Sequence, residues 1–344
     1  MSDGETLRVV FGSRSSHIGL AFCGFGVIAL VAAPLWGGRD DLGLLSEMFA
    51  YVALASLWNL LAGYAGLVSV GQQAYVGLGA YLLFAFVNLG GLSPLWAIPL
   101  AGLISGLVAI PVAALVFRLR GHYFAIGTWI IAEVFRLTAS QVSPLGGGSG
   151  TSLPAAMVVA IAPTRQWRDF IEYWIGLALV IAILAAIVLL LRSRYGLALK
   201  AIRDSEIAAR CSGIDVTRVK LLVYIVTALG TGMVGALIFL QKLRISPDAA
   251  FSVNDWTAFV IFITVIGGIG RIEGPIVGTI IFFVLRQTLA DLGTLYLMML
   301  GLVAIVVMLA APKGIWGLIA ARSGFSVFPL ERKVLFEELK PARD

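Results

Sequence analysis

Few side chains in this sequence could carry out acid–base, nucleophilic or metal chemistry. Two His and two Cys occur among 344 residues, and Cys23 and Cys211 lie far apart, in an apolar run and in a polar loop. No group of His and Cys has the spacing of a metal site. The sequence also lacks the Gly-x-x-x-x-Gly-Lys-Ser/Thr loop that binds nucleotide phosphates. We therefore expect this chain to contain no catalytic residue and to bind no metal or cofactor.

Glu133 and Arg136 form the clearest charged pair within an apolar run, and their spacing places them on one helical face. An ionisable residue in a membrane span marks either a functional site or a structural ion pair. Glu133 could contact an ammonium group or only neutralise Arg136, and the sequence leaves both roles open. Thr128, in the same run, is a candidate to line a pathway.

A glycine-rich run carries polar side chains at Gln72, Gln73 and Tyr75, which are followed by Gly77 and Gly79. Glycine breaks helices, and broken backbone at membrane depth is tolerated only where it is buried or lines a cavity. Half-helix ends there can bind the carboxylate and ammonium of a zwitterion without fixed side-chain charges. The polar residues favour a place in the substrate pathway, whereas close packing of small residues is the alternative for the glycines.

A second glycine-rich run contains Gly267, Gly268 and Gly270 and is followed by Gly274 and Gly278. The first three are candidates for the same pathway. Close helix packing is again the alternative.

The segment 192–218 is the longest polar stretch between apolar runs that is also rich in basic residues. Asp204 is a suitable N-cap and Gly213 a suitable helix end, which predicts a short helix over 205–212. Its small residues, Ala208, Ala209 and Ser212, would let a partner surface approach closely. The alternative is a solvated loop, and the pattern alone does not decide between them.

The elements that must position these residues are membrane helices, because 60% of the residues are hydrophobic and only 13% are charged. A soluble domain carries about 25% charged residues, so this composition excludes a typical soluble enzyme, a disulfide scaffold and a disordered chain. A span needs about 20 residues. The apolar runs between residues 17 and 311 predict ten spans, at 17–35, 45–62, 74–89, 94–117, 121–140, 173–191, 218–241, 253–266, 275–290 and 294–311.

The distribution of basic residues predicts the orientation. With ten spans both ends lie on one side, which then holds eighteen of the 25 Lys and Arg, against five on the other side. By the positive-inside rule, the segments 1–16 and 312–344 and the loop 192–218 are cytoplasmic, and the loop 141–172 lies outside. This asymmetry explains the net charge of +6 without a nucleic-acid partner. The first run is too long for a signal-peptide core, so we expect an uncleaved span.

Several blocks of sequence resemble one family of permeases. The loop contains Gly196-Leu-Ala-Leu-Lys-Ala-Ile-Arg-Asp-Ser-Glu206, then Ala208-Ala209 and Gly213-Ile214, and it resembles the coupling segment of ABC-transporter permeases, closest to the branched-chain amino-acid permease family. The runs Gly63–Tyr81 and Val265–Gly278 and the motif Pro312-Lys-Gly-Ile-Trp-Gly317 resemble further blocks of that family, in the same order. Members often have His where Gln72 and Gln73 stand, and Glu where Asp204 stands, which puts the exact substrate in doubt.

The resemblance implies an all-α integral membrane protein of about ten helices, some of them short or broken, and leaves open two inverted five-helix halves. It implies a multi-pass permease of the bacterial inner membrane, which imports branched-chain amino acids or a related solute by alternating access. Its partners would be a second homologous permease, two subunits that bind ATP and Mg, a periplasmic binding protein and membrane lipid. The residues implied in ATPase coupling are Arg203, Asp204, Glu206, Ala208, Ala209 and Gly213.

Two alternatives remain. An importer of urea, short amides or aromatic acids would belong to the same family. An ion-coupled secondary transporter would require intramembrane carboxylates as ion sites, and Glu133 is the only clear one.

Overall fold

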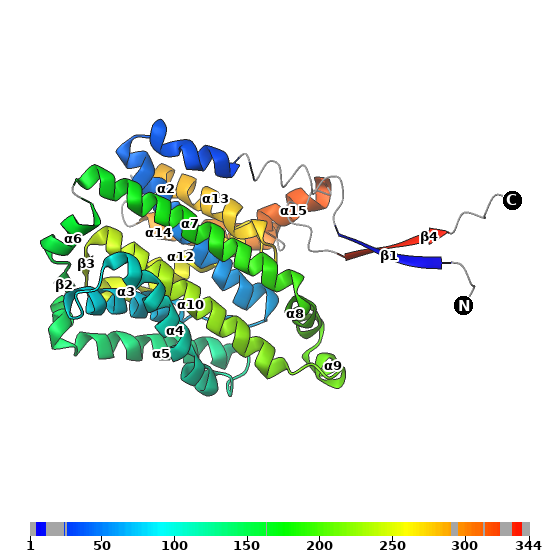
Figure 1. Ribbon diagram of the computed structural model, residues 1–344. Helices are drawn as coiled ribbons and strands as arrows, with labels where there is room; N and C mark the ends of the chain where they lie inside the picture. The colour runs from blue at the N-terminus through cyan, green and yellow to red at the C-terminus, as the bar shows by residue number, and fades with distance from the viewer. Residues whose placement is uncertain are drawn as a thin grey trace.

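The computed structural model describes residues 5–11, 24, 26–162, 164–289, 295–311, 314–323 and 332–338. Within these residues the chain is a bundle of helices that run side by side (Figure 1). The principal helices are α2 (Arg39–Asn59), α3 (Gln72–Asn88), α4 (Pro94–Val116), α5 (His122–Ser140), α7 (Arg165–Arg192), α10 (Val216–Lys242), α12 (Phe259–Gly267), α13 (Glu273–Leu289) and α14 (Leu295–Ala310).

Shorter elements connect these helices. They are the 3-10 helices η1 (Ala33–Leu35), η3 (Ser143–Leu145) and η4 (Gly147–Ser149), the π-helices η2 (Leu60–Tyr64) and η5 (Asn254–Ala258), the helices α6 (Ala155–Ile161), α8 (Arg194–Asp204), α9 (Glu206–Cys211), α11 (Pro247–Ala250) and α15 (Gly314–Ser323), and the strands β2 (Thr151–Ser152) and β3 (Arg244–Ile245).

Six candidate spans in the described part of the chain are long and apolar enough to cross a membrane: 39–64, 94–116, 165–192, 216–242, 247–267 and the stretch that begins with α14 at Leu295. The α3 and α13 helices have 17 residues each, fewer than the ~20 that a perpendicular span needs. The all-α membrane fold predicted from composition is confirmed. Of the predicted first span, residues 17–23 and 25 lie outside the described part, and an apolar helix covers Gly26–Leu35.

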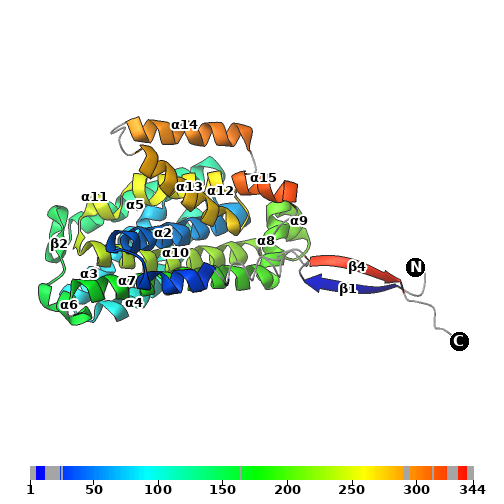
Figure 2. The same ribbon diagram turned by 90° about the horizontal axis from the view of Figure 1, so that it is seen from above.

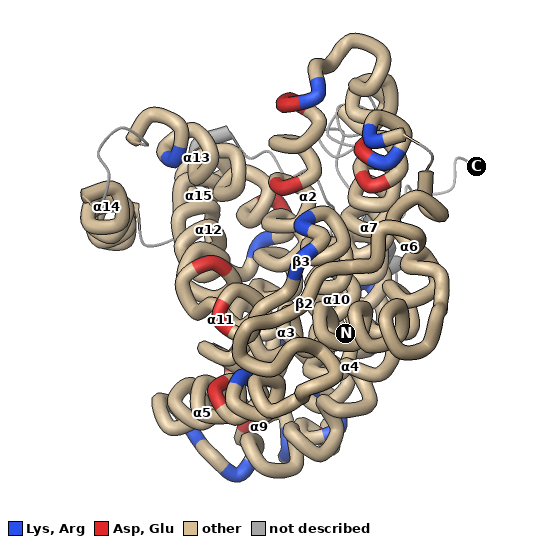
Figure 3. The backbone as a smooth tube through the Cα atoms, turned by 90° about the vertical axis from the view of Figure 1, so that its left-hand side faces the viewer, with Lys and Arg blue, Asp and Glu red and all other residues tan. Residues whose placement is uncertain are grey.

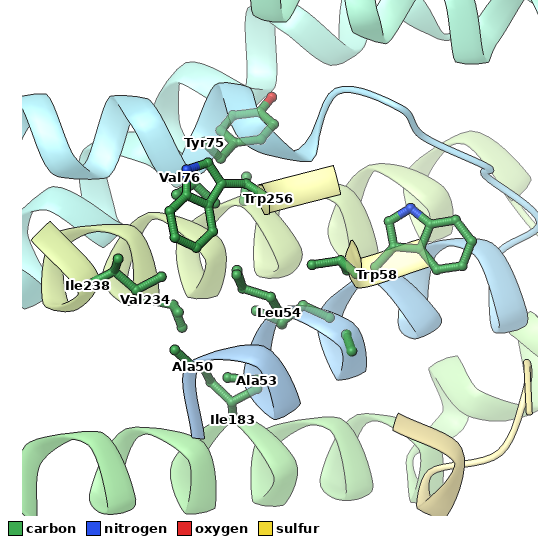
Figure 4. Close-up of a cluster of buried hydrophobic side chains, with 14 of the residues drawn as sticks. Ala50, Ala53, Leu54, Trp58, Tyr75, Val76, Ile183, Val234, Ile238 and Trp256 are labelled. Atoms are coloured by element: carbon green, nitrogen blue, oxygen red, sulfur yellow. The ribbon is translucent and has the colours of Figure 1, made fainter. Parts of the chain in front are cut away.

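The α10 helix lies at the centre of the bundle and packs against α2, α3, α4 and α7. Its contact with α2 buries small and branched side chains, including Ala50, Ala53, Leu54, Val234 and Ile238 (Figure 4). Small residues let the helix backbones come close, as is common where lipid provides no hydrophobic drive for helix association.

The α7 helix begins inside the predicted outer loop 141–172, because the Thr164 hydroxyl accepts a hydrogen bond from the Trp167 N–H (3.4 Å) and caps it. The α14 helix stands at the margin of the bundle (Figure 2), and its main contacts are with α12, α13 and α15.

Two small sheets lie at opposite ends of the bundle. The strand β1 (Glu5–Phe11) pairs antiparallel with β4 (Arg332–Glu338), with Glu5 opposite Glu338, and both lie at the end that carries α8 and α9 (Figure 1). The strands β2 and β3 pair at the other end. The two predicted loops, 141–172 and 192–218, therefore lie at opposite ends.

Candidate transport pathway and coupling segment

Two interrupted helices meet inside the bundle. The α3 helix begins at Gln72, after the non-helical stretch 65–71, and η5 forms a π turn before α12. The Gln73 N–H donates a hydrogen bond to the Thr257 hydroxyl oxygen (3.3 Å), and that hydroxyl donates to the Gln73 side-chain oxygen. Both side chains are 1% exposed. The first turn of α3 is thereby joined to the π turn through side chains.

Gln72 adds a second polar group at this point. Its Nε2 donates to the Leu54 carbonyl oxygen (3.0 Å) on α2. The Gln72 Oε1 atom is buried without a hydrogen-bond partner among the described residues, and the same is true of Ser56 Oγ on α2. An unsatisfied buried polar atom costs about 1–3 kcal/mol, so its presence in a native protein calls for a role.

The predicted lining residue Thr128 closes the same region. Its hydroxyl accepts from the Val70 N–H (3.1 Å) and donates to the Ala125 carbonyl oxygen (2.8 Å). A side chain at Gly71 would collide with the Thr128 backbone, so only glycine allows the chain to pass α5 this closely. Thr128, Gln72 and Gln73 are thus brought together.

The next three predicted residues lie further along α3 and pack against its neighbours. The Tyr75 hydroxyl donates to the Tyr224 hydroxyl (3.1 Å) on α10. A Cβ at Gly77 would meet the Phe251 ring, and one at Gly79 would meet the Gly232 backbone. Close packing accounts for both glycines in this arrangement.

Glu133 lies apart from these residues. Arg136 donates to Glu133 (3.0 Å from Nε) and, through Nη1, to Asp248 (2.8 Å) on α11. The Glu133 side chain is 45% exposed on the outside of the chain. The ion pair with Arg136 is present, and Asp248 is a third member that sequence reasoning missed, since it lies 112 positions away.

The second glycine run forms the turn between α12 and α13. Gly268 and Gly270 have φ of 127° and 77°, which side chains other than glycine rarely adopt. Asn59 clamps this turn, accepting from the Gly270 N–H (2.8 Å) and donating to the Arg271 carbonyl oxygen (2.7 Å). The one feature of the sequence that could have pointed to Asn59 is that it is a polar residue within the predicted span 45–62.

The same turn contacts the α8 helix. A Cβ built on Gly270 would lie 3.3 Å from the Arg203 guanidinium, so α8 touches the turn directly. Gly267 packs against Gly274, and Gly268 against Gly314 at the start of α15. These contacts place the second glycine run at the α8–α9 end, away from Gln73.

The predicted helix over 205–212 is present as α9, but its cap differs from the prediction. The Ser205 hydroxyl accepts from the Ala208 N–H (3.2 Å). Asp204 is instead the last residue of α8, because α8 continues to the residue directly before the cap. Gly213 has φ of 82°, which agrees with the predicted helix end.

The small-residue face of α9 is divided between two surroundings. Ala209 is 2% exposed and faces the rest of the chain, whereas Ile207 is 78% exposed and Ala208 is exposed too. Of the two predicted alanines, Ala209 lies on the covered face of α9 and Ala208 on the exposed face, so their role in coupling stays a prediction. The outward apolar side chain is Ile207, which no sequence pattern singled out.

Glu206 ties α9 to α10. Its carboxylate accepts from Lys220 Nζ (2.7 Å) on α10 and from Arg210 (2.8 Å) within α9. The hydrogen bond from Lys220, followed by the one from Arg210, lowers the pKa of Glu206 below its ordinary value. The α9 helix is therefore attached to a central helix.

We expect this tie to loosen in acid. A carboxylate with a lowered pKa stabilises the folded state above its ordinary pKa, and that contribution is lost as the pH falls through the folded-state pKa. Because Glu206 is half-exposed, the effect is about 0.5 kcal/mol. Hydrogen exchange of the 205–213 amides, corrected for intrinsic rates, should show protection at pH 7 that weakens towards pH 3. In Glu206→Gln the protection should be lower at pH 7 and independent of pH. Equal pH dependence in both proteins would contradict this.

Comparison with known proteins adds an independent finding. Residues 42–312 match the family described as the permease component of branched-chain amino acid transport systems. The high-affinity branched-chain amino acid transport system permease protein LivM of Salmonella typhimurium is 28% identical over 311 residues, which cover 84% of this chain and 73% of that protein. LivM of Escherichia coli gives the same identity and coverage.

A more distant similarity covers a smaller part. The ribose import permease protein RbsC of Bacillus subtilis is 33% identical over 138 residues, which are 39% of this chain and 43% of that protein. No solved structure matches.

Proposed function

The chain belongs to the family of permease components of branched-chain amino acid transport systems, and on this basis we propose that it is the membrane-spanning subunit of an ATP-driven importer of branched-chain amino acids. As a permease component it is a multi-pass membrane protein that works with other subunits. These are a second homologous permease, two ATP-binding subunits that bind ATP and Mg, and a periplasmic binding protein. The membrane is the bacterial inner membrane, with α8, α9 and both termini in the cytoplasm.

One structural observation supports this proposal above the others. The α9 helix presents an exposed isoleucine, Ile207, at the end of the bundle, while Glu206 ties it to α10 and Arg203 in α8 contacts the Gly270 turn. An ATPase that moves α9 would therefore move α10, which packs on α3, and the turn held by Asn59. A large exposed apolar side chain on such a short, anchored helix suits a pocket on a partner subunit.

The test is uptake by the complete complex in proteoliposomes. Leucine, isoleucine and valine should accumulate only with ATP and the loaded binding protein. Uptake driven by an ion gradient without ATP would instead indicate a secondary transporter. Accumulation of urea or short amides alone would indicate a different substrate.

A change at the tip of α9 should uncouple transport. Ile207→Asp removes the exposed apolar side chain and introduces a charge that has no counter-charge in an apolar pocket. We expect a folded permease with one of two defects. Either the ATP-binding subunits separate from it during purification, or the ATP hydrolysis stimulated by the loaded binding protein falls at least tenfold. Thr217→Asp is the matched control, because this exposed residue lies in the first turn of α10, where a carboxylate is favourable. Normal stimulation in Ile207→Asp would place the coupling contact elsewhere.

Gln73 allows pathway and packing roles to be separated. Gln73→Leu should lower uptake, but it also removes the oxygen to which the Thr257 hydroxyl donates and so destabilises the protein by about 1–3 kcal/mol. Thr257→Val is the comparison for stability, because it breaks the same side-chain hydrogen bond, also removes the acceptor of the Gln73 N–H, and keeps the Gln73 side chain. If Gln73 lines the pathway, uptake falls in Gln73→Leu but not in Thr257→Val, although the second variant is destabilised at least as much. Equal loss of uptake in both variants would assign Gln73 to packing.

A further inference from the structure

A group of charged and aromatic side chains at the β3 end takes no part in the contacts of Gln73 or of the coupling segment. It consists of Glu47 on α2, Lys242 at the end of α10, Asp255 and Trp256 in η5, and Arg286 on α13. We call it the outer cluster. Viewed from this end, basic and acidic positions lie on the elements around α2, α12 and α13 (Figure 3).

Lys242 is the unusual member. Its ammonium lies 4.8 Å from the centre of the Trp256 ring and 5.1 Å from that of Phe239. Among the described residues, no carboxylate lies within ion-pair distance of it and no hydrogen bond is made to it. The charges of Asp255, Glu47 and Arg286 nevertheless act on it through space. Two aromatic faces thus hold an exposed cation that makes no side-chain hydrogen bond to the described part of the chain.

Asp255 is the complementary member. Its backbone N–H bonds to the Ser252 hydroxyl (3.3 Å), which holds the start of the π turn in place. Its carboxylate makes no ion pair within the described part of the chain. Glu47 and Arg286, by contrast, satisfy each other at 2.6 Å. The cluster therefore contains one unpaired charge of each sign beside a neutralised pair.

The surroundings of these two charges are aromatic. Trp256 is 4% exposed and stacks on Tyr51 at a centroid distance of 6.2 Å, and Phe239 meets it edge-on. Asp255 directly precedes Trp256, and Lys242 covers its ring, so both charges flank one indole. Thr257, the next residue, is the partner of Gln73, which makes the cluster continuous with the candidate pathway.

We propose that the outer cluster is a binding site for a free zwitterionic amino acid, in which Lys242 binds the carboxylate and Asp255 the ammonium. The site receives the substrate at the outer end before it reaches Gln73. This inference rests on the proposed function, because it assumes that an amino acid enters from this end.

The experiment measures equilibrium binding to the assembled complex without the binding protein, in detergent or nanodiscs. Three probes of similar apolar shape are compared: leucine, 4-methylpentanoate, which lacks the ammonium, and 3-methylbutylamine, which lacks the carboxylate. The wild-type complex should bind leucine about tenfold more tightly than either analogue, because each analogue loses one charged hydrogen-bonding group.

The variants should remove these preferences one at a time. Lys242→Met retains an apolar stem over the two rings. We expect this variant to bind leucine no more tightly than it binds 3-methylbutylamine. Its affinity for 3-methylbutylamine should equal that of the wild-type complex. Asp255→Asn should bind leucine no better than 4-methylpentanoate. Lys242→Arg should keep the wild-type preference. Arg39→Gln, which breaks the 2.7 Å pair with Asp169 at the outer end of α2, is the matched control and should leave all three affinities unchanged.

The outcomes separate this inference from the proposed function. A wild-type complex without preference for leucine, or unchanged preferences in Lys242→Met and Asp255→Asn, would overturn the site. A purely structural role for Lys242 would lower the affinities of all three probes together, and this also overturns it. Failure of ATP-dependent leucine uptake by the wild-type complex would instead overturn the proposed function.

Discussion

Gly79→Val should prevent the bundle from assembling and should destabilise the protein more than the loss of any one buried hydrogen bond. A Cβ at this position would run into the backbone of Gly232, so α3 and α10 could no longer approach each other. Backbone cannot move aside as a flexible side chain does, and overpacking of this kind costs about 3 kcal/mol or more. The measurement is the yield of monodisperse protein in detergent and its thermal unfolding.

Gly301→Val is the control for this prediction. Gly301 also lies in an apolar helix, α14, but nothing stands within 4 Å of a Cβ built there. The two changes are chemically identical, so any general effect of valine on membrane insertion cancels. Equal yields for both variants would show that α3 and α10 are not held this closely, and would make Gly79 a pathway candidate again.

Asn59→Leu should destabilise the turn that joins α12 to α13. Asn59 is 2% exposed, and leucine has nearly its shape but cannot replace its hydrogen bonds to Gly270 and Arg271. Two backbone groups then lose their partner, at about 1–3 kcal/mol each where water cannot replace it. We expect a less stable protein with faster exchange of the 268–272 amides, and loss of transport-linked ATP hydrolysis because Arg203 contacts this turn.

A neighbouring position on α2 gives the control. Ser56 lies three residues earlier, and its buried hydroxyl has no hydrogen-bond partner among the described residues, so Ser56→Ala should be neutral or slightly stabilising. Wild-type exchange at 268–272 in Asn59→Leu would show that the turn is held by other contacts.

Much of the fold could be predicted from the sequence because membrane spans are defined by local composition. A run of apolar residues of sufficient length identifies a helix wherever the rest of the chain lies. The end of α9 at Gly213 was predictable for the same reason, since a left-handed residue after a helix favours glycine. The cap was not, because Asp204 and Ser205 are both good caps and the choice depends on where α8 ends.

The candidate sites were predicted less well because their partners are distant in the sequence. Asn59 acts on residues 211 and 212 positions away, and Asp248 reaches Arg136 from a different helix. Ala209 looked available on a helical pattern, yet its burial depends on how α9 folds back against the chain. Side chains that work across helices leave no periodic signal.

The two π turns also bear on how related chains can be aligned. A π turn holds one residue more than an α turn, so a chain that lacks one residue within Leu60–Tyr64 or Asn254–Ala258 can close the turn as α-helix and keep every later side chain on its original face. The same deletion in α10 would rotate all following residues by about 100° and carry Gly232 away from Gly79. One-residue gaps between homologues should therefore gather at these two π turns, and an alignment that places a gap within α10 pairs residues that do not occupy equivalent positions.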